Sequence, residues 1–173
     1  VLAAGASKRL GSHKALVEVE GQTLVQLVCS KLQTAGLSVT VVTRNSLKQK
    51  IENLLPNVST VVNPNPELGR TGTIQRGIES IGTGPLLIIP VDRPGFSLET
   101  INLLCKTNTT TIPAYEQKGG HPIAITSQDC ENILQAEPNI PLRELISPER
   151  MHVEDPHLHP VSYTHLTLPT TSK

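Results

Sequence analysis

The sequence begins with VLAAGASKRLGSHKAL, residues 1–16, in which an apolar run breaks into a loop of small residues before apolar residues resume. Small residues let the backbone come close to a ligand, and exposed N–H groups in such a loop can hold anionic oxygens. Arg9 and Lys14 add two positive charges suited to a polyphosphate. The spacing matches neither the dinucleotide-binding pattern G-x-G-x-x-G nor the P-loop pattern G-x-x-x-x-G-K-S/T. The competing interpretation is a Gly/Ala turn that carries two solvated basic side chains.

Composition narrows the class of protein. A chain of 173 residues is the size of one domain with a buried core. Its 15 basic and 15 acidic residues balance and only 2% of residues are aromatic, so we expect no nucleic-acid and no membrane partner. No apolar run approaches the roughly 20 residues of a membrane span, and no signal-peptide pattern is present. The separated Cys29, Cys105 and Cys130 predict reduced, mostly buried thiols in a cytoplasmic protein.

Both ends of the sequence depart from what one complete domain predicts. Val1 falls inside the expected first strand, so we expect a domain over residues 1–160 that is truncated at both ends. Residues 161–173 have a composition unlike the rest, and VSYTHLTLPT back-translates to a sequence that resembles a transposon-end adapter from DNA library preparation. We interpret residues 161–173 as a non-native read-through tail. The alternative is a native Thr-rich tail.

Between the ends, short apolar runs alternate with helical patterns, which predicts β-α-β units and an α/β fold with a mostly parallel sheet. We expect strands at 1–2, 39–43, 58–62, 85–90, 109–114 and 121–126. We expect helices at 23–35, 46–55, 73–81, 97–106, 127–135 and 142–146. The run at 85–90 is the most apolar, so we place it at the centre of the sheet.

Three segments are expected at the carboxyl ends of the strands, where open α/β sheets bind ligands. They are the opening loop, the polar and glycine-rich segment 63–77, and the turn 91–94. Asp92 in that turn is suited to Mg²⁺, which prefers one or two carboxylates together with substrate phosphates. The alternative is that Asp92 caps the helix expected to begin near Ser97. His121, between a glycine and a proline, is an acid–base group, an acceptor-binding group or a turn residue.

Four segments occur in one order: LAAGASKRLGSHK, NPNPELGRTGTIQRG, PVDRPGFS and KGGHPIAI. Together they resemble the bacterial molybdenum-cofactor cytidylyltransferases and their relatives in the MobA-like NTP transferase family. The Ala-Ala-Gly form of the loop and the G-H-P element favour the cytidylyl branch. The resemblance implies a three-layer α/β/α sandwich with a mostly parallel, Rossmann-like sheet of the nucleotide-diphospho-sugar transferase type. It also implies transfer of CMP from CTP, with Mg²⁺, to the phosphate of molybdopterin and release of pyrophosphate.

The resemblance also implies roles for individual residues. Arg9 and Lys14 would be catalytic, holding the triphosphate, while Asp92 would hold Mg²⁺ and His121 would face the acceptor. Nucleotide binding would fall to Leu2, Ala3, Ala4, Gly5, Ser7, Asn63, Thr71 and Thr73. The family has a second acidic element near its C-terminus, in a D-T-P-E-D-like stretch. Here Asp155 arrives just before that point and the second acid is absent, so we expect the printed chain to be a poor enzyme.

Two other hypotheses remain open at the level of sequence. The first is a nucleotidyltransferase that uses another NTP or a sugar-phosphate-like acceptor. The second is a non-catalytic nucleotide-binding protein that delivers cofactor to a molybdoenzyme. The expected partners are therefore an NTP, a molybdopterin-type acceptor and, in the second case, a molybdoenzyme.

Overall fold

The first sheet carries the opening loop at its carboxyl edge. The computed structural model of the protein describes residues 1–7 and 11–158. Strands β1 (Leu2–Ala3), β4 (Thr40–Thr43) and β5 (Ser59–Val62) are parallel, in the order β1-β4-β5. β-branched residues dominate β4, as expected for a strand buried between two helical layers. The chain leaves β1 directly into the loop of small residues, so the sheet fixes where that loop begins.

The second sheet extends the first. Its order is β10 (Glu149–His152), β7 (Thr111–Tyr115), β9 (Ile123–Ile125) and β6 (Leu86–Ile88), with the short β8 (Lys118–Gly119) paired to β7. The strand β9 is antiparallel to both of its neighbours. An isolated parallel bridge between Leu2 and Pro90 joins the sheets, and the Leu2 N–H donates to the Ile89 carbonyl at 2.8 Å. The apolar run at 85–90 therefore lies in the middle of the strand order, which confirms its predicted place.

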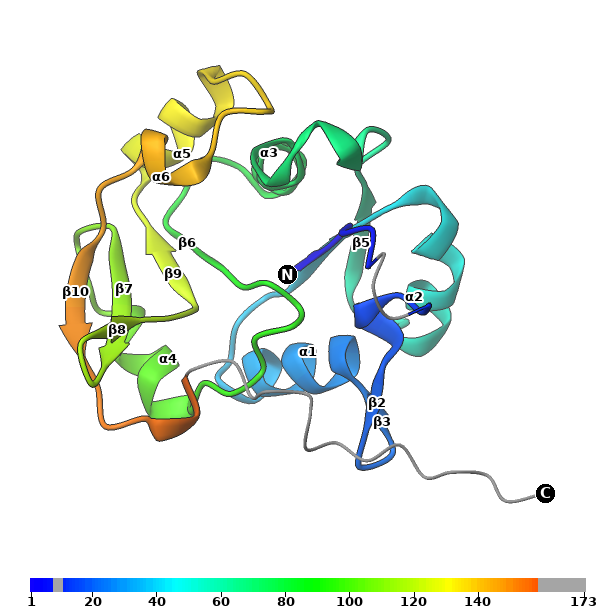
Figure 1. The fold of residues 1–173 in the computed structure, drawn as a ribbon, viewed down its shortest axis with the longest axis horizontal. Helices are drawn as coiled ribbons and strands as arrows, with labels where there is room; N and C mark the ends of the chain where they lie inside the picture. The colour runs from blue at the N-terminus through cyan, green and yellow to red at the C-terminus, as the bar shows by residue number, and fades with distance from the viewer. Residues whose placement is uncertain (8–10, 159–173) are drawn as a thin grey trace.

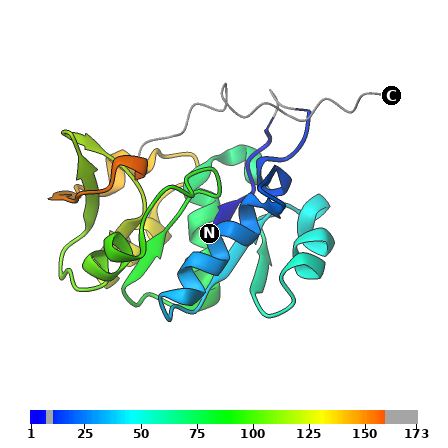
Figure 2. The same ribbon diagram turned by 90° about the horizontal axis from the view of Figure 1, so that it is seen from below.

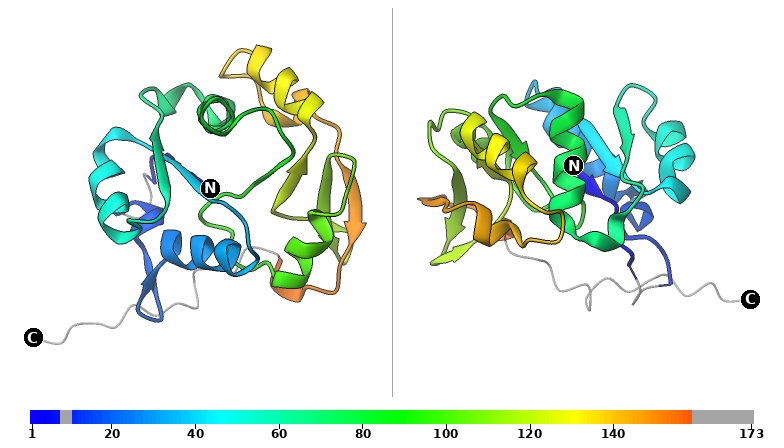
Figure 3. Two further views of the ribbon diagram at one scale, coloured as in Figure 1. Left: turned by 180° about the vertical axis from the view of Figure 1, so that it is seen from behind. Right: turned by 90° about the horizontal axis from the view of Figure 1, so that it is seen from above.

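Helices cover both faces of the sheets, as Figure 1 shows. The helices are α1 (Leu24–Thr34), α2 (Lys48–Leu54), α3 (Arg70–Ile81), α4 (Leu98–Leu104), α5 (Ser127–Gln135) and α6 (Leu142–Leu145). Figure 2 shows α1 and α4 together on one face, and the right view of Figure 3 shows α3 beside α5 on the other. This arrangement confirms the expected three layers.

Local capping explains where several helices begin. The side chain of Thr23 accepts a hydrogen bond from the Gln26 N–H, and Gln26 bonds back to Thr23 in a capping box. Ser97 and Thr126 cap α4 and α5 in the same way. Four strands were not predicted: β8, β10 and the hairpin of β2 (Glu18–Val19) with β3 (Gln22–Thr23). The strands β2, β3 and β8 are two residues long, and β10 has one apolar residue, Met151, among its four, so none shows a detectable periodicity.

Apolar side chains from both layers fill the core, and Phe96, Leu24, Ile51 and Ile101 are among the largest fully buried ones. Cys29 and Cys130 are buried, and desolvation raises the pKa of each thiol to about 11, whereas Cys105 is exposed. Across residues 1–7 and 11–158, no helix has the length and apolar character needed to cross a membrane.

Candidate functional site

The three segments expected at the carboxyl ends of the strands do meet. They enclose a cavity of about 480 Å³. Its lining includes Leu2, Ala3, Ala4, Gly5, Ser7, Lys14, Arg70, Thr73, Pro90 and Asp92. A larger cavity of about 830 Å³ lies between β4 and β6, but no charged side chain lines it. A polyphosphate needs cationic partners, so the smaller cavity is the candidate site.

The opening loop presents its backbone to this cavity. A Cβ added at Gly5 would meet no heavy atom within 4 Å, so the space beside this backbone is open. Ser7 adopts a φ of 46°, in the left-handed region, and its Oγ accepts a hydrogen bond of 2.9 Å from the Lys14 N–H. That bond ties the two ends of the loop together. Arg9, the other predicted catalytic cation, lies outside the described residues.

Lys14 and Asp92 meet across the cavity although 78 positions separate them in sequence. The Lys14 Nζ donates to the Asp92 Oδ2 at 2.8 Å, and the two side chains are 41% and 28% exposed. Burial acts to raise the pKa of Asp92, but the hydrogen bond and charge of Lys14, together with Arg93, outweigh it and lower that pKa. Asp92 is therefore ionised at neutral pH. Because Ser97 caps α4, the alternative role of Asp92 as the helix cap is excluded.

A divalent cation fits this arrangement. Mg²⁺ needs a hard, ionised oxygen ligand, and it commonly takes one or two carboxylates and completes its shell with phosphate oxygens and water. Asp92 supplies such a carboxylate at the cavity wall. Within residues 1–7 and 11–158 no group of three or more His, Cys, Asp or Glu side chains is arranged to hold a metal.

The segment that runs from the Asp92 turn into α4 is held from two sides. On one side, the Lys31 Nζ of α1 donates to the carbonyl oxygens of Pro94 and Phe96, the latter at 3.1 Å. On the other, the Asp155 Oδ2 accepts from the Ser97 N–H at 2.8 Å and from the Thr100 Oγ1 at 2.9 Å. Asp155 is only 4% exposed. Asp155, the last acidic residue before the tail, is thus a buried anchor for the start of α4.

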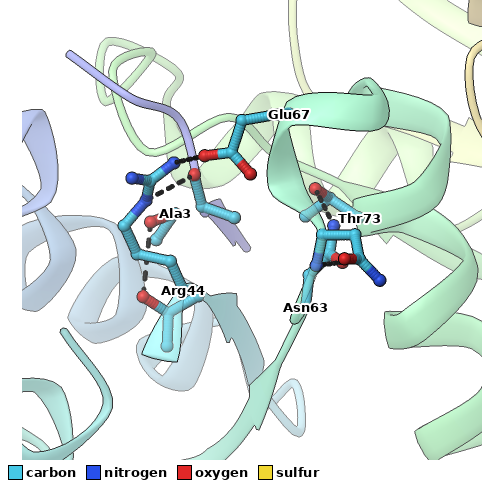
Figure 4. A network of polar contacts seen from close by, with 8 residues as sticks. Ala3, Arg44, Asn63, Glu67 and Thr73 are labelled. Carbon is cyan, nitrogen blue, oxygen red and sulfur yellow. Dashed lines mark hydrogen bonds and ion pairs between the residues drawn. The ribbon is translucent and has the colours of Figure 1, made fainter. Parts of the chain in front are cut away.

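The segment 63–77 contributes a buried polar network, drawn in Figure 4. The Asn63 Nδ2 donates to the Thr73 Oγ1 at 3.0 Å, and the Asn63 Oδ1 accepts from the Asn65 N–H at 3.0 Å. Thr73 lines the cavity, with Asn63 bonded to it. Thr71 is 1% exposed, donates to the Ile140 carbonyl and does not line the cavity. The structure therefore brings Thr73 to the site, whereas Thr71 fastens α3 to the loop before α6.

Sequence reasoning missed Arg44, which joins two walls of the site. Its Nε donates to the Ala4 carbonyl at 3.1 Å and its Nη2 to the Glu67 Oε1 at 3.1 Å, as Figure 4 shows. These bonds fix the backbone of the opening loop against the segment that precedes α3. In sequence Arg44 is one cation after a strand, so no local signal distinguishes it from a solvated side chain.

His121 precedes β9, whose Ile123 pairs with Ile88 of β6. It is not among the residues that line the 480 Å³ cavity. Its Nδ1 is buried, with no hydrogen-bond partner among the described residues. Burial, followed by the charges of Arg93 and Arg70, lowers its pKa to about 4. Burial and these charges therefore favour the neutral imidazole of His121 at physiological pH.

Comparison with known proteins gives one family. The family described as MobA-like NTP transferase domain matches residues 1–155. A "Probable molybdenum cofactor guanylyltransferase" of Bacillus mycoides (strain KBAB4) is 28% identical over 119 residues, which cover 66% of this chain and 58% of that relative. The "Molybdenum cofactor guanylyltransferase" of Vibrio atlanticus (strain LGP32) is 28% identical over 127 residues, covering 71% and 64%. The chain thus spans about three fifths of the length of these curated relatives.

A solved structure shares the fold. A nucleotidyl transferase from Methanothermobacter thermautotroptrophicus matches with a TM-score of 0.72 at 20% identity, covering 91% of this chain and 87% of that chain. With the observed strand order, this likeness confirms the expected mixed α/β architecture of the nucleotide-diphospho-sugar transferase type.

Proposed function

The chain belongs to the MobA-like NTP transferase family, and we propose that it transfers a nucleotidyl group from an NTP to a molybdopterin-type phosphate acceptor, releasing pyrophosphate. The observation that carries this proposal is the meeting of the opening loop, Lys14 and Asp92 in one cavity. A loop open to the cavity at Gly5 suits phosphate oxygens, because backbone N–H groups can approach them closely. Lys14 would neutralise the triphosphate, with Arg9 as its proposed partner.

The proposed chemistry needs no protein nucleophile. An oxygen of the acceptor phosphate attacks the α-phosphorus, the new P–O bond forms, and the bond from the α-phosphorus to the bridging oxygen breaks as pyrophosphate leaves. The residues of the cavity contribute by positioning the two reactants and by offsetting the charge that develops between them. We propose that Asp92 holds Mg²⁺, which when bound would neutralise part of the phosphate charge.

For the base we propose cytosine, since the Ala3-Ala4-Gly5 form of the loop and the Gly120-His121-Pro122 element favour the cytidylyl branch. Guanine is the second candidate, because both curated relatives are named molybdenum cofactor guanylyltransferases. A sugar-phosphate-like acceptor and a non-catalytic delivery role remain the competing functions.

Two measurements test the proposal. Thermal shifts with CTP, GTP, UTP and ATP, each with Mg²⁺, compare the bases, and we expect the largest stabilisation with CTP. Pyrophosphate release is then followed with molybdopterin as acceptor. Release that requires both the NTP and molybdopterin supports the transferase. If a nucleotide stabilises the protein but no pyrophosphate is released in the presence of acceptor, the result supports the delivery protein instead. If GTP gives a larger thermal shift than CTP, GTP replaces CTP as the proposed substrate.

A further inference from the structure

Two arginines beside the candidate site have no part in the chemistry described so far. Arg70 is the first residue of α3 and lines the 480 Å³ cavity. Arg93 follows Asp92 directly in the turn after β6 and is half-buried; it does not itself line the cavity, but its charge acts on Asp92, which does. In the part of the chain that the structure describes, neither guanidinium group has a carboxylate within ion-pair distance. These arginines therefore leave positive charge uncompensated at the site.

The other charged side chains at the site do not offset the positive charge of the two arginines. Lys14 and Asp92 offset one another through their 2.8 Å ion pair. His121, which precedes β9, is neutral because burial and the charges of Arg93 and Arg70 disfavour its protonation. Among the described residues, Arg70 thus adds positive charge at the cavity wall, and Arg93 adds it in the turn next to Asp92. Guanidinium groups bind phosphate through two parallel hydrogen bonds, so an oxyanion is the ligand that this charge suits.

Packing fixes the position from which Arg70 extends. Gly69 has a φ of 135°, and a Cβ there would lie 2.9 Å from the Pro138 carbonyl oxygen. The Gly72 N–H donates to that same oxygen at 3.2 Å, and Thr71 donates to the Ile140 carbonyl. The start of α3 is therefore wedged against residues 138–140. An arginine at a fixed helix end loses less freedom when it binds a ligand than one on a mobile loop.

We propose that Arg70 and Arg93 bind the phosphate of the acceptor, a phosphomonoester, while Lys14 and the opening loop bind the nucleotide. This assignment rests on the proposed function, because a transfer between two phosphates brings two anions together and each needs its own countercharge. The arginine pair is then the part of the site that recognises the acceptor's charge.

The test compares Arg70→Met, Arg93→Met and the double variant with Arg76→Met. Arg76 lies on the same helix, is exposed and pairs with Glu79 at 3.0 Å, so it is a matched control. Losing one charge-assisted contact should raise the KM for the acceptor about tenfold, with the KM for the NTP unchanged. Arg70→Lys and Arg93→Lys, which keep the charge, should recover part of the loss. A rise in the KM for the NTP, or equal effects from Arg76→Met, would overturn the assignment.

A second readout separates this inference from the proposed function. Inorganic phosphate is titrated calorimetrically into the parent, the double variant and Arg76→Met, all without nucleotide. All three proteins keep the opening loop, so phosphate bound there contributes equally to each. If only the double variant binds phosphate more weakly, the lost binding belongs to Arg70 and Arg93. If no acceptor supports transfer but this difference remains, the arginine site stands and the transferase fails. If transfer proceeds with an unchanged acceptor KM in the double variant, the arginine site fails and the transferase stands.

Discussion

Asp155→Asn should destabilise the fold strongly, because this carboxylate is buried and holds the start of α4. The side chain is 4% exposed and accepts from the Ser97 N–H at 2.8 Å and from the Thr100 hydroxyl at 2.9 Å. Hydrogen bonds to a charged group contribute about 1.5–3 kcal/mol each. The asparagine oxygen can accept one of these hydrogen bonds, now a neutral bond of about 1 kcal/mol. Its NH₂ group can only donate, so it cannot replace the carboxylate oxygen as an acceptor for the other donor. The expected loss is therefore about 2–5 kcal/mol, or roughly 10 °C in Tm for a domain of this size.

Urea unfolding monitored by circular dichroism measures this loss, and Glu154→Gln is the matched control. Glu154 precedes Asp155, and its side chain is 84% exposed, so its substitution should change the free energy of unfolding by less than about 0.5 kcal/mol. Since the turn that carries Asp92 leads directly into the start of α4, Asp155→Asn should also weaken Mg²⁺-dependent nucleotide binding. Equal midpoints for Asp155→Asn and Glu154→Gln would refute the anchoring role derived from these two hydrogen bonds.

Three further outcomes are expected. Lys14→Ala should weaken NTP binding, measured by calorimetry, about tenfold or more. The control Lys50→Ala removes an exposed cation on α2 and should leave the NTP affinity unchanged. If the two variants bind the NTP with equal affinity, Lys14 is not part of the site. Asp92→Asn should abolish Mg²⁺-dependent transfer while the thermal transition stays cooperative, and activity at the parent's rate with the same Mg²⁺ dependence would make Asp92 structural. Because the pKa of His121 falls from 6.5 to about 4 on folding, the unfolded chain binds the extra proton, so stability present above pH 6.5 is lost as the pH drops toward 4. The free energy of unfolding lost in this way is on the order of 3 kcal/mol. Chemical denaturation at a series of pH values measures it, and the same pH dependence in His121→Gln as in the parent would contradict this prediction.

The sequence by itself determined the elements whose signals are local. The apolar spacing after Thr23 and the β-branched run that forms β4 were enough to place α1 and that strand, because side-chain periodicity and capping act within a few residues. The opening loop and Asp92 were also identified in advance, since each follows an apolar strand and open α/β sheets gather such segments at one edge.

Contacts between distant segments decided the rest. The helix predicted at 73–81 begins at Arg70, because Gly69 and Thr71 bond and pack against residues 138–140, which no local pattern near α3 reveals. Glu154 and Asp155 are also indistinguishable in sequence. Glu154 is solvated whereas Asp155 is buried, because Asp155 bonds to the start of α4, which is more than fifty positions away in sequence.

The charge arrangement of the site is likewise a tertiary property. The sequence named Lys14, Asp92 and His121 as candidates, but their roles were taken from a resemblance and their mutual positions were unknown. The ion pair of Lys14 with Asp92, the neutral state of His121 and the uncompensated charges of Arg70 and Arg93 follow only from the folded chain. Electrostatic interactions depend on distance and desolvation, and neither quantity exists until the sheet brings its strand ends together.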